Sequence, residues 1–475
     1  MLGLSAFGER FGPVRRGSDY RPHQYVKFVR VRLSSDPSVL RCGPAYRRVV
    51  NFSLIPQLDH VRRHLNAKQM ALETPAWLNL CFVEKILRKS EGDNSIQVIE
   101  IFSKPATTKG DGYSSDMIRV TAEFSRDQGD SKITEKKSII VKISPIAEGI
   151  RQDLVELSGI FDVEILMMSD TLDKMNKLLG QEHRLSGKGL YVQNKNPTLL
   201  VIEDLAPLGF RMADRLSGLD LAHTILALDG LARFHAASVA ICEKEPKQKE
   251  MYTKGIFNDQ YPPEVQNFFV ISLKALADEV ANWPGMKKYS EKIAKLTDHI
   301  YKIGIDASKL CEDEFNVINH GDFWVNNMLF KYDNNGKPVQ HICVDFQNCV
   351  YTSPAIDLQY FLSTSPSPDV IENKRDVLLN EYLGVLSATM KQLGCKTQPP
   401  TMEELKTTLK RRASYGMIAS FLVLPIVLCC KTEVKDLDEM MNSDTFSSPG
   451  LKSESYIKLM MKRIPMYDEW GLLDL

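Results

Sequence analysis

Three side chains that carry oxygen lie in the second half of the chain, in an order that suits phosphoryl transfer. Asp322 and Asn327 are five residues apart in the segment His-Gly-Asp-Phe-Trp-Val-Asn-Asn, and Asp345 follows an apolar segment typical of a strand. Transfer of a phosphoryl group from ATP needs a carboxylate beside the attacking hydroxyl, and Mg²⁺ needs hard oxygen ligands. We therefore predict that Asp322 is the catalytic base, and that Asn327 and Asp345 serve catalysis as ligands of Mg²⁺.

Each of these residues alone would indicate only a loop, because Asp and Asn are common in turns. The ordered set, with apolar segments on both sides, favours a nucleotide site. His320 begins the same motif, and we expect it to support the loop through hydrogen bonds rather than to react. Asp357, 12 residues after Asp345, is expected to start a helix and to accept backbone N–H groups of the catalytic loop.

Residues that could bind phosphate lie upstream. Gly110 and Gly112 fall in a turn between two predicted strands, where backbone N–H groups can approach a phosphate, although a plain hairpin would use the same glycines. Lys142 lies inside an apolar strand-like segment, where its charge needs either an anion or an exit to water at a sheet edge. After a glycine turn, Lys142 becomes the predicted catalytic ligand of the α- and β-phosphates. Its partner on the next helix is predicted to be Glu164, with Glu156 as the competing candidate.

A predicted strand at 198–202 leads into Glu203, Asp204 and Leu205. We expect these three residues to form the connection between two lobes. Their main chain, rather than any side chain, would present one carbonyl and one N–H to adenine. A strand that simply ends in an acidic turn is the alternative interpretation.

The pattern of apolar residues predicts an α+β fold with a small β-rich N-lobe and a larger, mainly helical C-lobe. Strands are expected at 96–102, 117–124, 138–143 and 198–202, with a charged hairpin tip at 126–137. Helices are expected from Thr74-Pro75 onward, at 154–168, at 221–234, and within 264–310 and 371–470. The predicted divisions are a basic N-terminal extension at 1–70, the N-lobe with its hinge at 71–205, and at 206–475 the C-lobe with the catalytic loop and acceptor pocket.

The charge of the whole chain is balanced, with 60 Lys and Arg against 60 Asp and Glu in 475 residues, so no field attracts nucleic acid or anionic lipid. Residues 1–70 carry 13 basic and four acidic side chains. We expect a poorly ordered, dispensable extension there, with a targeting peptide as the alternative. The nine cysteines, scattered and without a Cys-x-x-Cys pair, suit reduced thiols in the cytoplasm. The apolar segment 416–430 is shorter than the roughly 20 residues of a membrane span. No membrane span and no obligate protein partner are expected.

These motifs resemble the aminoglycoside-phosphotransferase-like kinases and, more closely, the ecdysteroid-kinase-like (CHK kinase-like) family. The resemblance runs from about Ala71 to the C-terminus and is carried by Lys109-Gly-Asp-Gly-Tyr-Ser-Ser115 with Arg119, the Lys142 strand, Phe161-x-x-Glu164, Val201-Ile-Glu-Asp-Leu205, Leu231-Ala-Arg-Phe-His-Ala-Ala-Ser238, His320-Gly-Asp-Phe-Trp-x-Asn-Asn327, Asp345-Phe-Gln347 and Asp357-Leu-Gln-Tyr-Phe361. It implies the bilobal protein-kinase-like fold and ATP-dependent phosphorylation of a small-molecule hydroxyl. Some members of this family phosphorylate ecdysteroid hormones, and others are linked to detoxification.

The chain between the metal ligand and the next helix argues against a protein kinase. Only 11 residues separate Asp345 from Asp357, and no Ala-Pro-Glu follows, so there is too little chain to build a platform for a peptide substrate. We therefore expect a small-molecule acceptor. Gln347 stands where protein kinases have a glycine, which changes the backbone freedom beside a metal ligand.

The sequence leaves the identity of the acceptor open. We expect residues 251–300 and 365–475 to form its pocket, where Trp283, Tyr289, Phe421 and many acidic residues would suit a sterol or a polar amine alike. An ecdysteroid, another sterol or a xenobiotic alcohol is the leading interpretation. A choline- or ethanolamine-type kinase and a catalytically silent module that holds a nucleotide or a hormone are the alternatives.

Overall fold

The computed structural model describes residues 75–475 except 108–114, 146–149, 196, 262, 431 and 434–447. The chain divides into one unit of Met1–Ala67 and another of Lys68–Leu475, and only the second contains described residues. The expected extension at 1–70 and the glycines Gly110 and Gly112 lie outside the described residues, so those expectations stay predictions.

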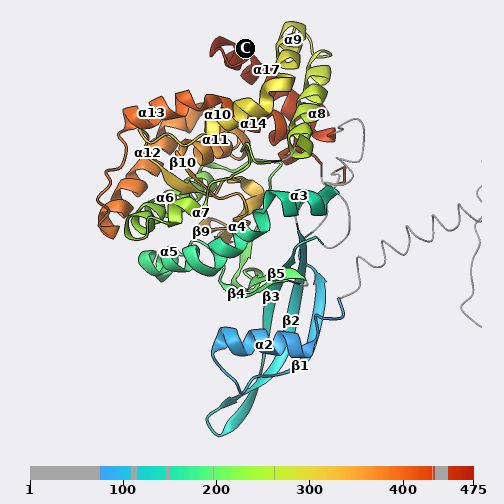
Figure 1. The fold of residues 1–475 in the computed structure, drawn as a ribbon, viewed down its shortest axis with the longest axis vertical. Helices are drawn as coiled ribbons and strands as arrows, with labels where there is room; N and C mark the ends of the chain where they lie inside the picture. Colours follow the sequence, from blue (N-terminus) through green and yellow to red (C-terminus); the bar gives the residue numbers. More distant parts are fainter. Residues whose placement is uncertain are drawn as a thin grey trace, which may run out of the picture. The chain divides into compact units, whose positions relative to one another are not determined.

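The N-terminal part of the described chain is built on an antiparallel sheet of five strands in the order β1-β2-β3-β5-β4 (Figure 1). The strands are β1 (Gln97–Pro105), β2 (Asp116–Gln128), β3 (Ser131–Ile143), β4 (Gly189–Asn194) and β5 (Thr198–Glu203). Helix α2 (Leu80–Glu91) packs on this sheet, with Val83 and Ile86 in the same core as Val120 and Val201. The helix begins later than the expected Thr74-Pro75.

The hairpin of β2 and β3 is longer than the sequence predicted. The segment 126–137, expected as a charged tip, is mostly strand, and only Gly129-Asp130 form the turn. Lys136 and Glu123 are directly opposite each other and form an ion pair of 2.9 Å. Opposite charges across neighbouring strands stabilise a sheet, so the polar composition of this segment does not interrupt the strands. Strand β4 was not predicted at all.

The helix expected at 154–168 is divided into three pieces. Helices α3 (Ile150–Ser158) and α4 (Ile160–Leu166) meet at Gly159, whose φ of 65° is left-handed. A π-helical turn at Met167–Thr171 joins α4 to α5 (Leu172–Leu179). Because a left-handed residue changes the direction of the chain, α3 and α4 do not continue as one helix. Val155 of α3 and Ile160 of α4 line one cavity, and Glu164 of α4 lines another.

The rest of the described chain is mainly helical (Figure 1). Its helices are α6 (Leu221–Lys244), α7 (Gln248–Met251), α8 (Pro263–Val280), α9 (Lys287–Leu296), α10 (Ile300–Ser308), α11 (Ala355–Thr364), α12 (Pro368–Leu393), α13 (Met402–Arg411), α14 (Ala413–Leu422), α15 (Leu424–Val427) and α17 (Glu454–Glu469). Helix α6 is long and apolar enough to cross a membrane, but 72% of its apolar window is buried inside the fold. It packs along α12 as a core helix.

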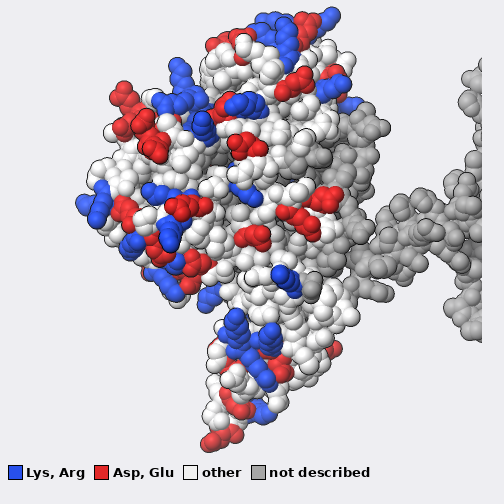
Figure 2. Space-filling model, viewed as in Figure 1, with Lys and Arg blue, Asp and Glu red and all other residues white. Residues whose placement is uncertain are grey.

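Short strands within the helical lobe flank the loop that contains the predicted catalytic motif. Strand β7 (Val317–Asn319) pairs with β10 (Val350–Thr352), and β8 (Met328–Tyr332) lies between β6 (Phe210–Arg211) and β9 (Pro338–Cys343). The loop 320–327 therefore connects β7 to β8. The described chain has the predicted α+β class, with a β-rich N-lobe and a helical C-lobe. On the face in Figure 2, basic and acidic side chains are interspersed.

Candidate active site

One carboxylate of α11 binds the loop 320–327 through two hydrogen bonds. Asp357 accepts the backbone N–H groups of His320, at 2.7 Å, and of Gly321, at 2.8 Å. Gly321 has a φ of 81°, and a Cβ atom at this position would lie 1.9 Å from the backbone oxygen of Asn348. A residue with a side chain would therefore push the loop away from its neighbour. Asp357 lies where the sequence analysis placed it, at the start of a helix and beneath the loop.

His320 is a buried, hydrogen-bonded part of the same loop. Its Nε2 atom lies 3.0 Å from the carbonyl of Val344, and its Nδ1 accepts the N–H of Asp322 at 3.4 Å. The ring also lies 4.7 Å from the ring of Phe346. Burial lowers the pKa of His320, so the neutral form with a proton on Nε2 satisfies both contacts. This arrangement is that of a support for the loop.

Asp322 is partly buried and lies between two hydrogen-bond donors. Its Oδ1 accepts the hydroxyl proton of Tyr360 at 2.7 Å, and its Oδ2 accepts from Nδ2 of Asn327 at 3.0 Å. Burial, reinforced by the negative charge of Asp345, raises the pKa of Asp322 to about 7 although both hydrogen bonds oppose the shift. A carboxylate with this pKa can take up a proton near neutral pH.

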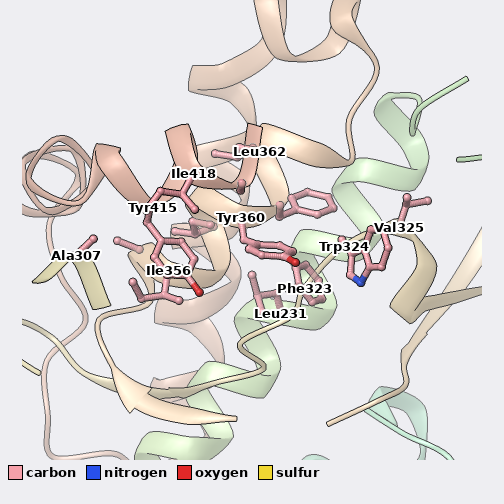
Figure 3. Close-up of a cluster of buried hydrophobic side chains, with 14 of the residues drawn as sticks. Leu231, Ala307, Phe323, Trp324, Val325, Ile356, Tyr360, Leu362, Tyr415 and Ile418 are labelled. Atoms are coloured by element: carbon pink, nitrogen blue, oxygen red, sulfur yellow. The ribbon is translucent and has the colours of Figure 1, made fainter. Parts of the chain in front are cut away.

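The aromatic residues next to Asp322 are packed into the core of the C-lobe. Figure 3 shows Phe323 and Trp324 beside Tyr360 and Leu231. Phe323 has no exposed surface, and its ring lies 5.2 Å from that of Phe361 on α11. Because these side chains anchor the loop between β7 and β8, Asp322 is held in place by packing as well as by hydrogen bonds.

Lys142 on β3 lies in contact with two carboxylates from other elements. Its Nζ is 2.5 Å from Glu164 of α4 and 2.7 Å from Asp345, while only 3% of the Lys142 side chain is exposed. Burial opposes the charge of Lys142, but the two carboxylates together raise its pKa above the usual value. Glu156, the competing candidate, instead accepts a hydrogen bond from Gln152 on its own helix. The structure therefore brings Glu164 rather than Glu156 to Lys142.

Asp345 has an unusual backbone conformation. Its φ of 67° makes it the one residue other than glycine with a left-handed backbone in the described chain. Such a conformation costs on the order of 1 to 3 kcal/mol and is typical of functional sites. Nε2 of Gln347 lies 3.4 Å from Oδ2 of Asp345, so the residue that replaces the kinase glycine contacts the predicted metal ligand.

Several of the predicted residues, but not Asp322, line one cavity of about 330 Å³. Lys142, Glu164, Asn327 and Asp345 lie along it, together with the expected connection Glu203–Leu205. Apolar side chains form the rest of the wall, among them Met117, Ile140, Met168, Phe210, Leu329 and Phe346. An apolar cavity in which a few polar groups converge suits a purine base and its phosphates.

The side chains of the connection face the protein. Glu203 pairs with Arg184 and accepts the N–H of Lys188 at 3.1 Å. Asp204 is buried and accepts two hydrogen bonds from Arg119, at 2.7 and 3.2 Å. Both carboxylates are therefore engaged by groups of the protein, and the expectation that the main chain rather than these side chains binds adenine stays a prediction.

The main chain of the connection is partly occupied as well. The N–H of Glu203 donates to Lys188, and the carbonyl of Leu205 accepts from Leu208 and Phe210. These two backbone groups therefore already make hydrogen bonds within the protein. Contacts to adenine would have to come from other backbone groups of the connection.

The donor set at the end of this cavity fits a magnesium ion. No cluster of three or more His, Cys, Asp or Glu side chains suitable for a metal occurs among the described residues. Asp345 and Asn327 instead offer one carboxylate and one amide oxygen, and Mg²⁺ commonly takes only one or two protein ligands beside phosphates and water. Nδ2 of Asn327 donates to the carboxylate of Asp322. The other polar atom of this amide is Oδ1 of Asn327, and this oxygen is the atom that could bind a metal ion.

A second cavity, of about 300 Å³, is lined in part by Asp322, which does not line the first cavity. Its lining is almost entirely apolar and comes from α3, α8, α11 and α14, with Val155, Phe268, Phe269, Tyr360, Tyr415, Ile418 and Leu422 among the residues. Residues of 251–300 and of 365–475 both contribute to this lining, and α3 supplies part of it as well. Trp283, Tyr289 and Phe421 do not line this cavity; Trp283 packs against Tyr456.

Several supporting residues had no predicted role. Tyr360 follows Asp357 by three positions on α11, so helical spacing alone could have placed both toward the loop. His235 of α6 lies 3.0 Å from Asp357 and 2.8 Å from the hydroxyl of Tyr382. The motif Leu231–Ser238 contains His235, but no function was predicted for this residue. No pattern in the neighbouring sequence links it to Asp357, 122 residues away.

The chain is similar to a known protein family and to solved structures. Residues 109–395 match the model of the ecdysteroid kinase-like family, whereas no curated protein sequence matches the chain. Among solved structures, an ethanolamine kinase of Plasmodium vivax is similar at 11% identity and a TM-score of 0.37, covering 78% of this chain and 84% of that one. An amicoumacin kinase in complex with AMP-PNP, Ca²⁺ and Ami is similar at 12% identity and a TM-score of 0.36, covering 88% of this chain and 95% of that one. Since the family match spans more than half of the 475 residues, the chain belongs to the ecdysteroid kinase-like family.

Proposed function

We propose that the protein transfers the γ-phosphoryl group of ATP, with Mg²⁺, to the hydroxyl of an apolar small molecule. One observation supports this most strongly. Asp322 lines the apolar cavity, while Asn327, its hydrogen-bond partner, lines the cavity that contains Lys142 and Asp345. A carboxylate that lines one cavity and is hydrogen-bonded to a residue of the other is where an acceptor hydroxyl and a terminal phosphate would meet.

The residues divide the chemistry as follows. Lys142 would bind the α- and β-phosphates, and Asp345 with Oδ1 of Asn327 would hold Mg²⁺, which neutralises phosphate charge when bound. Asp322 would accept the proton of the acceptor hydroxyl. The oxygen of that hydroxyl would bond to the γ-phosphorus while the bond from this phosphorus to ADP breaks. The raised pKa of Asp322, about 7, suits this role.

The lining of the second cavity favours an apolar alcohol, such as an ecdysteroid, another sterol or an apolar xenobiotic. Asp322 is the one acidic residue in that lining among the described residues. Ethanolamine would need further acids for its ammonium group. Choline could stack on the aromatic side chains, but the aliphatic residues Val155, Ile418 and Leu422 give it no partner for charge.

Tyr415 supplies a polar group inside this otherwise apolar cavity. The residue is 3% exposed, and its hydroxyl makes no hydrogen bond to the described residues. Burial raises the pKa of Tyr415, so the hydroxyl keeps its proton and can donate it. We propose that it bonds to a second oxygen of the acceptor, away from the hydroxyl that is phosphorylated.

The decisive experiment incubates the protein with Mg-ATP and a panel of acceptors, and detects the phosphate ester by mass spectrometry. The panel contains an ecdysteroid, a sterol, an apolar aromatic alcohol, choline and ethanolamine. We expect an ester of an apolar alcohol, lost in Asp322→Ala and on chelation of Mg²⁺. Asp298→Ala, which removes an exposed carboxylate outside both cavities, is the matched control and should keep the activity.

The other outcomes identify the alternatives. Esters of choline or ethanolamine alone would overturn the proposed acceptor and keep the phosphotransferase. Mg-ATP binding without an ester or ATP hydrolysis, unchanged in Asp322→Ala, would indicate a silent module. Cytoplasmic localisation also remains our prediction, which fractionation of cells that express the full chain would test.

A further inference from the structure

A third cavity, of about 270 Å³, lies among α11, α12, α14 and α17. It shares no described lining residue with the two cavities of the candidate active site. Neither the family match nor the proposed reaction assigns a role to it. Its lining combines arginines with apolar and aromatic side chains, and these arginines are the feature that needs an explanation.

Arg375 of α12 lines this cavity without a partner for its charge. Among the described residues, no hydrogen bond or ion pair reaches its guanidinium group. The adjacent Asp376 is bound to Lys406 at 2.7 Å and exposed. Burial and the positive charge of Arg463 together lower the pKa of Arg375. A partly buried cation beside a second cation is unfavourable unless an anion compensates for it.

The remaining charged residues do not provide that anion. Arg463 of α17 donates from Nη1 to two neutral oxygens, the carbonyl of Ser363 at 2.7 Å and Oγ of Ser420 at 2.9 Å. Glu372 is the one acid of the described lining. It is already paired with Lys462 at 2.8 Å. The lining therefore holds two arginines with no carboxylate of their own.

We propose that this cavity binds a small amphipathic anion, whose carboxylate, sulfate or phosphate head pairs with Arg375 and Arg463. The planar guanidinium group matches such oxygen pairs in geometry and remains charged. The apolar body of the ligand would lie against Leu362, Met466 and Trp470, the last of which is 50% exposed. This proposal does not depend on the proposed phosphotransferase activity.

The test measures binding to the full-length protein by isothermal titration calorimetry. Naphthalene-1-sulfonate is the probe, and naphthalene-1-sulfonamide is its neutral control of similar shape. We expect one equivalent of the sulfonate to bind, and Arg375→Met to weaken that binding roughly 10- to 100-fold, the effect of losing a charged hydrogen bond. Lys374→Met removes the same charge from an exposed neighbour outside the cavity, and should change the affinity less than about twofold.

Thermal unfolding checks that the variant is folded and gives a second readout. Without anion, Arg375→Met should melt at the wild-type temperature or above, because it removes an uncompensated charge. With the sulfonate, the wild-type protein should gain stability and Arg375→Met should not. Equal binding of sulfonate and sulfonamide, equal binding by Arg375→Met, or no binding to the wild type would each overturn the proposal.

Discussion

The hydrogen bond between Tyr360 and Asp322 gives the sharpest prediction, because only one of its two partners titrates near neutral pH. Tyr360→Phe removes the hydroxyl that lies 2.7 Å from Oδ1 of Asp322 and leaves the aromatic ring. The hydroxyl donates to an ionised carboxylate above the pKa of Asp322, about 7, and to a neutral carboxyl group below it. The cost of the substitution should therefore depend on pH.

The size of this dependence follows from the strength of the two kinds of hydrogen bond. A hydrogen bond to a charged group contributes roughly 1.5 to 3 kcal/mol, against roughly 0.5 to 1.5 kcal/mol between neutral groups. Tyr360→Phe should thus lower the free energy of unfolding by about 1 to 2 kcal/mol more at pH 8.5 than at pH 5.5. Equivalently, the pKa of Asp322 should rise further in the variant, by about one unit for each 1.4 kcal/mol.

Urea unfolding followed by tryptophan fluorescence at the two pH values measures this difference. Tyr261→Phe is the matched control, because its buried hydroxyl donates to the carbonyl of Gly255 at 2.9 Å, a group that does not titrate. Its cost should be the same at both pH values. If Tyr360→Phe cost the same at pH 5.5 and pH 8.5, or more at the acidic pH, the assignment of a raised pKa to Asp322 would be wrong.

Three further predictions concern the other parts of the site. Glu164→Gln should lower the free energy of unfolding by roughly 2 to 4 kcal/mol, because Lys142 loses a buried partner, whereas Glu156→Gln should cost less than about 0.5 kcal/mol; urea unfolding measures both. Asp357→Asn should cost roughly 2 to 4 kcal/mol in the same assay, since its new amide hydrogens face backbone N–H groups that need an acceptor. Tyr415→Phe should raise KM about tenfold for an acceptor with a second oxygen and leave KM unchanged for one without it; equal effects on both acceptors would contradict the proposed contact.

The sequence was most informative where residues act through short stretches of chain. The roles of Asp322, Asn327 and Asp345 could be predicted from their order in the chain, because the short loop and the hairpin after it allow few arrangements of these side chains. Lys142 belongs to β3 and Glu164 to the helical segment that follows it, as its second helix α4, so their meeting could be anticipated from the order of the elements. Their catalytic roles remain predictions until activity is measured.

The features of the structure that could not be predicted from the sequence depend on packing between distant segments. The wall of the apolar cavity combines α3 with α14, more than 200 residues apart, and periodicity does not say which helices meet. Arg119 reaches Asp204 across 85 residues. The pattern also failed for 126–137, where cross-strand ion pairs replace the alternation of apolar residues that normally indicates a strand.

The contact of Lys142 with Glu164 and Asp345 has a consequence for the order of events at the site. One ammonium group between two carboxylates leaves the trio with an excess negative charge, which repels a bare triphosphate across a cavity of low polarity. Asp345, if it held a divalent ion bound to the nucleotide as proposed, would offset this repulsion and would leave the ammonium group of Lys142 available to the phosphates. The resting ion pairs would therefore screen out metal-free nucleotides before any acceptor is engaged.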